Sequence, residues 1–158
     1  EMLDAGMAVG LATDAGNNSN LVETNRAMYL IAVLYKDARQ DSKTIPAETA
    51  LEMATIQGAE ALGLDAEVGS LEVGKKADLV LYDTRNVEWQ TLFNPVNNLV
   101  YNADGRSVHL VMVDGKIVVE DHKPLFVDEW ALIQKVQGIG EDMLARIGLS
   151  FPPRWPIV

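Results

Sequence analysis

A run of small and apolar residues near the amino terminus ends on a single carboxylate. Residues 7–13 read Met-Ala-Val-Gly-Leu-Ala-Thr, and Asp14 follows them directly. The run predicts a strand, and a carboxylate at the end of a strand is where chemistry sits in a barrel of repeating strands and helices. On spacing alone, the interpretation of Asp14 as a residue that forms a turn or caps the next helix is favoured over the chemical one.

The residues beside Asp14 have the same two interpretations. Asn17 and Asn18 are candidates for binding polar groups of a substrate at a pocket entrance, and Thr13 is a candidate donor that orients Asp14. The alternative is that Asn18, Ser19 or Asn20 caps the following helix and that Thr13 is a β-branched strand residue.

Composition excludes several classes of function. The chain has 158 residues and a formal net charge of -10, which disfavours a nucleic-acid partner because a phosphate backbone is bound by clustered Lys and Arg. It contains no Cys, so disulfides, thiolate metal ligands and a Cys nucleophile are excluded, and a reducing cytoplasm is the expected location. No apolar run approaches the roughly 20 residues that span a bilayer.

Periodicity predicts helices first and strands later. Apolar residues at helical spacing indicate helices over 21–40, 46–55 and 57–62, the last ended by Gly63. Residues 1–6 read as the last turn of a helix closed by Gly6, so we expect the chain to be part of something longer.

From Val68 onward the pattern changes to strands. The elements expected there are a strand at 77–82, a capped short helix at 94–101, a hairpin of 108–113 with 116–120 around Asp114-Gly115, and a helix at 128–146. Three strands are too few for a closed sandwich, which predicts that further strands come from outside this chain.

Three segments resemble the carboxyl-terminal third of the amidohydrolase superfamily, in its branch of adenosine-type, S-adenosylhomocysteine and guanine deaminases and triazine hydrolases. They are 10–14, 50–64, and 69–83 together with 111–116. The resemblance implies an α/β fold: the carboxyl-terminal end of a (β/α)8 TIM-like barrel and the carboxyl share of a small β-sandwich domain. Residues 1–66 would be the last strand and closing helices, 67–124 part of the β domain, and 125–158 a terminal helix and tail.

The resemblance also implies a divalent metal, zinc or iron, held by a His-x-His pair, a further His and the Asp that ends the eighth strand. Asp14 matches that Asp, which makes it both metal ligand and catalytic proton acceptor. The histidine ligands and the acidic Glu of the family have no counterpart among these residues. His109 and His122 match no family ligand and are expected on a sheet face and a surface turn.

The implied activity is hydrolytic deamination or dechlorination of a purine, pyrimidine or triazine ring by a parent enzyme that is a homo-oligomer. The isolated chain would be inactive, and its partner would be the missing amino-terminal part, on the same or a separate chain. Two alternatives stay open at this point. The parent is a cyclic-amide hydrolase, dihydroorotase-like or imidazolonepropionase-like, or the chain is a non-catalytic binding or assembly module.

Overall fold

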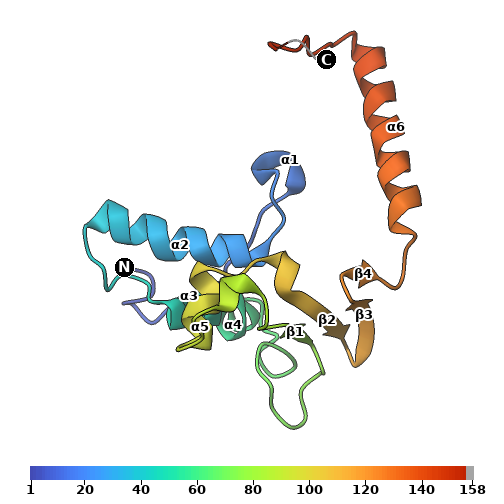
Figure 1. Ribbon diagram of the computed structural model, residues 1–158. Helices are drawn as coiled ribbons and strands as arrows, with labels where there is room; N and C mark the ends of the chain where they lie inside the picture. Colours follow the sequence, from blue (N-terminus) through green and yellow to red (C-terminus); the bar gives the residue numbers. More distant parts are fainter. Residues whose placement is uncertain (156–158) are drawn as a thin grey trace. The chain divides into compact units, whose positions relative to one another are not determined.

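The computed structural model describes residues 1–155, with the side chain of Ser19 left out. It divides into two compact units, the first covering Glu1–His122 and the second beginning at Lys123 (Figure 1). The first unit contains the helices and strands that surround the candidate site, so it is described first.

Three helices of the first unit make its core. They are α2 (Thr24–Arg39), α3 (Ala47–Ala54) and α5 (Pro95–Tyr101). Their contact surfaces are built largely from small residues, which lets the helix axes approach closely. The buried cluster consists of Met28, Ala32, Ala47, Ala50 and Val100.

Two short helices complete the helical part. Gly16–Ser19 forms α1, directly after Asp14 and Ala15, and Ile56–Ala61 forms α4, directly after α3. Gly63 follows α4 with a φ of 70°, which matches its predicted role as the residue that ends this helix.

The second half of this unit contains an antiparallel sheet. Its strands in the first unit are β1 (Leu79–Tyr82), β2 (Val108–Val113) and β3 (Lys116–Glu120), in the order β1-β2-β3. The register pairs Leu79 with Met112 and Val113 with Lys116. Asp114 and Gly115 have φ values of 50° and 76°, the positive pair that a two-residue hairpin turn needs, so the predicted hairpin is confirmed.

The connection from β1 to β2 runs through short helices. These are η1 (Val87–Trp89), α5 and η2 (Gly105–Ser107). The Asn94 side chain accepts hydrogen bonds from Val96 N at 3.0 Å and Asn97 N at 3.2 Å, which confirms the predicted capped helix.

The second unit contains β4 (Lys123–Pro124) and α6 (Glu129–Ile147). Asp128 caps α6 by accepting a hydrogen bond from Ala131 N, and Gly148 ends it in the left-handed region with φ of 64°. The predicted terminal helix is thereby confirmed. A search of the described residues finds no helix with the length and apolar character needed to cross a membrane.

Three local expectations differ from the structure. Residues 7–13 are extended but form no strand, because a strand needs a ladder partner and no described strand lies beside them. Residues 1–6 form hydrogen-bonded turns and no helix. Pro46 is the residue before α3, where its missing N–H also costs nothing. The division of the parent at residues 66 and 67 stays a prediction.

The cap expected for the first long helix is also wrong. Helix α2 begins at Thr24 after Glu23, whose side chain makes no capping hydrogen bond. Asn20 instead takes a left-handed conformation that ends α1, and the Asn18 side chain is used elsewhere. The Ser19 side chain lies outside the described residues.

Candidate functional site

Asp14 marks a sharp change in chain direction. Its φ is 59°, in the left-handed region that Asp tolerates better than most residues, and it joins the extended residues 7–13 to α1. Carboxylate Oδ1 accepts a hydrogen bond from Ala15 N at 2.7 Å, and Oδ2 accepts one from Asn18 Nδ2 at 3.0 Å. The side chain is exposed, so both oxygens keep lone pairs directed to solvent.

These two hydrogen bonds favour the ionised form of Asp14. The amide of Asn18, followed by the backbone N–H of Ala15, lowers the pKa of the Asp14 carboxyl below its ordinary value. Asp14 is therefore ionised at neutral pH, which suits a residue that binds a cation or accepts a proton.

The neighbours of Asp14 are arranged differently from one another. Asn18 contacts the carboxylate directly and holds it in one orientation. Thr13 Oγ1 donates to the backbone carbonyl oxygen of Asp14 at 3.3 Å and does not reach the carboxylate. Asn17 is exposed. The structure thus brings Asn18 and Asp14 together, and the substrate-binding role of Asn17 and Asn18 stays a prediction.

The donor set of this chain does not by itself fit a zinc or iron ion. Such ions take three or four protein ligands, and Asp14 offers one carboxylate. Among residues 1–155, no group of three or more His, Asp or Glu side chains is placed to hold a metal. The described part of the chain can therefore contribute one donor to a metal centre, with the others supplied from outside it.

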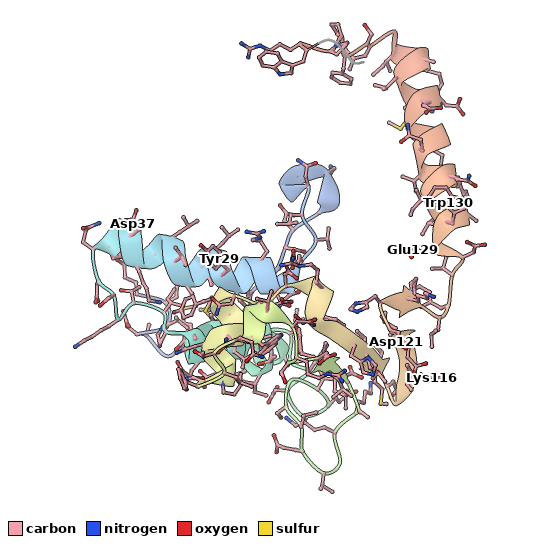
Figure 2. All side chains as sticks on the ribbon, viewed as in Figure 1. Tyr29, Asp37, Lys116, Asp121, Glu129 and Trp130 are labelled. Carbon is pink, nitrogen blue, oxygen red and sulfur yellow. The ribbon has the colours of Figure 1, made fainter. Side chains whose placement is uncertain are left out.

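The two histidines are placed as the sequence indicated. His109 lies on β2, where Nδ1 is 2.9 Å from Asp121 Oδ1, and both side chains are largely exposed. Asp121, labelled on the hairpin in Figure 2, and His122 form the turn that follows β3. Both histidines therefore lie at the surface, His109 on β2 and His122 in the turn after β3.

An apolar groove of about 1110 Å³ opens in the first unit. Gly10, Leu11 and Ala12 line it together with residues of α3, α4, β1 and β2. Leu11 N donates to Met53 O at 2.9 Å, which ties the extended segment to the end of α3. The residues just before Asp14 therefore form one wall of an open, mainly apolar surface.

The groove contains a polar pair that the sequence analysis missed. Tyr82 Oη donates to Asn25 Oδ1 at 3.0 Å, while the buried Asn25 Nδ2 has no hydrogen-bond partner among the described residues. Burial raises the pKa of the Tyr82 hydroxyl. The sequence feature that could have pointed to this site is Asn25, an amide side chain on the apolar stripe of α2, three residues before Met28.

The protein belongs to the amidohydrolase family. The model of that family, described as "Amidohydrolase family", matches residues 1–118, which is most of the chain. The α/β fold expected from the sequence agrees with this membership: the described helices and small sheet form part of such an architecture.

Three similar proteins are informative. A 5'-deoxyadenosine deaminase of Methanosarcina mazei is 35% identical over 147 residues, covering 93% of this chain and 34% of its own length. The zinc-bound crystal structure of an adenosine deaminase from Xanthomonas campestris has a TM-score of 0.88 and 29% identity, covering 91% of this chain and 33% of that one.

The third is the crystal structure of atrazine chlorohydrolase from Arthrobacter aurescens TC1 complexed with zinc. Its TM-score is 0.79 and its identity 26%, with 87% of this chain and 30% of that chain covered. The chain thus spans about a third of the length of the relatives that it matches.

Proposed function

We propose that this chain is the carboxyl-terminal part of a metal-dependent hydrolase that replaces an amino or halide substituent on a heteroaromatic ring with oxygen. The observation that carries the proposal is the match of nearly the whole chain to proteins named as deaminases of adenosine compounds and as a chlorohydrolase of a triazine. The ring of the substrate is then a purine, a pyrimidine or a triazine.

In this proposal residues 7–13 are the last strand of a (β/α)8 barrel, paired with strands supplied by the amino-terminal part. Their apolar sequence, extended backbone and position on an open groove support that role. Asp14 then lies at the carboxyl end of a barrel strand, where the active sites of such barrels are found.

The role assigned to this chain is that of one carboxylate. Water supplies the oxygen that bonds to the ring carbon, and the carbon–nitrogen or carbon–chlorine bond breaks. Chloride leaves as the anion, whereas the amino group leaves as ammonia after it takes up the proton that the attacking water lost. Asp14, ionised at neutral pH and held by Asn18, accepts a proton from the attacking water. Zinc or iron would bind Asp14 together with histidines outside this chain, in keeping with the zinc in two of the similar structures.

The residues around Asp14 have supporting roles in the same proposal. Asn17, exposed at the start of α1, contacts polar groups of the substrate, and Asn18 shares that task while it orients Asp14. Thr13 steadies the turn through the Asp14 carbonyl oxygen. The parent is a cytoplasmic homo-oligomer, and the isolated chain is inactive.

The test compares Asp14→Asn with the unchanged sequence in protein that carries its amino-terminal part. Asn keeps the shape of Asp but cannot accept a proton, so we expect turnover of adenosine compounds or chlorotriazines to fall by about 10²–10⁴-fold. Asp65→Asn, a change at an exposed loop residue, is the matched control and keeps full activity.

Three results would contradict the proposal. An active Asp14→Asn enzyme would remove the catalytic role of Asp14. Turnover of a cyclic amide in place of ring-substituted substrates would favour the dihydroorotase-like or imidazolonepropionase-like alternative. No turnover of either class by metal-loaded protein would favour a binding or assembly module.

A further inference from the structure

Helix α6 displays a continuous apolar stripe. Leu132, Val136, Ile139 and Met143 follow one another at spacings of four, three and four residues, which places them on one face of the helix. They are between 46% and 60% exposed, and none of the nineteen described residues of α6 is buried. Figure 2 shows side chains standing out along the whole helix, with Glu129 and Trp130 in its first turn.

The two flanks of this stripe differ in chemistry. Along one flank lie Ile133, Gly140 and Ile147, and both isoleucines are more than half exposed. Along the other flank lie Lys135 and Asp142, which carry opposite charges seven residues apart. In a two-helix coiled coil, flanking residues at these positions contact the partner helix and decide its identity and direction.

We propose that α6 pairs with α6 of a second copy of this chain as an antiparallel two-helix coiled coil. With Val136 of one copy opposite Ile139 of the other, Leu132 falls opposite Met143, so every layer of the stripe is apolar. The proposal concerns a face of the second unit and does not depend on the proposed enzymatic function.

Charge complementarity selects a second copy in this direction. Antiparallel pairing brings each flank against the same flank of the partner. Lys135 then faces Asp142 of the other copy, twice by symmetry, and Ile133 faces the small Gly140. Beyond the apolar layers, Glu129 of one copy reaches the level of Arg146 of the other, which adds a second pair of opposite charges at each end.

Parallel pairing has none of these features. It would place Glu129 against Glu129 and Arg146 against Arg146 along the seam, and it would set the apolar flank of one helix against the charged flank of the other. Like charges at these positions are unfavourable. The sequence of α6 therefore specifies the antiparallel arrangement of two identical helices.

Disulfide trapping tests the direction, since the sequence contains no cysteine and gives no background. Two variants of the 158-residue chain are made, Val136→Cys and Ile139→Cys, and oxidised separately and as a mixture. Antiparallel pairing predicts that the mixed disulfide between the two variants is the main product of the mixture. Disulfides formed mainly within each separate variant would show parallel pairing and overturn the proposal.

A charge exchange tests the flanks by sedimentation equilibrium. Lys135→Glu or Asp142→Lys alone sets like charges together and should weaken dimerisation roughly tenfold, and the double exchange should restore it. Lys135 and Asp142 are both exposed, so helix content by circular dichroism should not change. Equal effects of single and double exchanges, or a chain that stays monomeric, would show that another surface covers α6 and would overturn the proposal.

Discussion

The segment 7–13 and the strands of the β2–β3 hairpin are similar in composition but not in structure. Both are apolar and extended, yet only the hairpin has regular ladder partners. The partner of β2 follows two residues later through Asp114 and Gly115, whereas 7–13 has no described strand beside it and is held by a bond from Leu11 N to Met53 O.

The two segments differ in how far away in sequence their backbone hydrogen-bond partners lie. A hairpin satisfies its backbone groups with residues close in sequence, so a short piece of chain is sufficient to form it. A strand of a barrel is satisfied by neighbours far away in sequence. Under the proposed function, the segment that presents Asp14 is of the second kind, and its pairing depends on residues outside this chain.

The largest effect is expected where the extended segment is anchored. The Met53 side chain is 2% exposed, so Met53→Ala should cost about 2–5 kcal/mol of unfolding free energy through the cavity it leaves, while the backbone carbonyl that accepts from Leu11 N is kept. Leu62→Ala, at a side chain 76% exposed, should cost less than about 0.5 kcal/mol. Urea unfolding of both variants measures the two losses of unfolding free energy. Equal losses would mean that burial of the Met53 side chain contributes no stability.

A smaller effect is expected where the chain leaves the helices for the sheet. Gly69 has a φ of +94°, and a Cβ there would lie 2.8 Å from Ala59 Cβ. Gly74 has a φ of +100° with nothing within 4 Å. Both Gly→Ala changes share the backbone strain, so Gly69→Ala should lose about 1–3 kcal/mol more than Gly74→Ala in the same unfolding assay. No difference would mean that the chain moves freely at Gly69.

The sequence predicted the elements whose signals are local. Asp114-Gly115 and the Asn94 cap each act through residues within three positions, and both appear as expected. It failed for the segment 7–13, which was expected as a strand but has no ladder partner among the described residues, and for Asn18 as a capping candidate, since its side chain donates to Asp14.

The candidate site was predicted only in part for the same reason. Asp14 and Asn18 are close in sequence, so a contact between their side chains could have been predicted from the sequence. The pairing of Asn25 with Tyr82 joins residues 57 positions apart, and no local pattern indicates it.

The smallest effect concerns the charge of Asp14. Its pKa is lower folded than unfolded, so the associated stability is complete above the unfolded value of about 3.9 and is lost as pH falls through the folded value. Asn18→Ala should raise the pKa of Asp14 toward its ordinary value, and Asn17→Ala should leave it unchanged. Titration of the Asp14 carboxyl by NMR reads both, and an unchanged pKa in Asn18→Ala would mean that another group holds the carboxylate.

Hydrogen exchange of residues 8–13 tests the central claim most directly. It should be measured in this chain alone and in protein that includes the amino-terminal part, with the amides between β2 and β3 as the internal reference. Leu11 is set aside, because its N–H already donates to Met53 O in this chain. We predict fast exchange of residues 8–10, 12 and 13 in the chain alone, protection by at least about 100-fold in the longer protein, and equal protection of the reference amides in both. Segment amides that are equally protected in both proteins, or unprotected in both, would contradict the assignment of 7–13 as a barrel strand completed from outside.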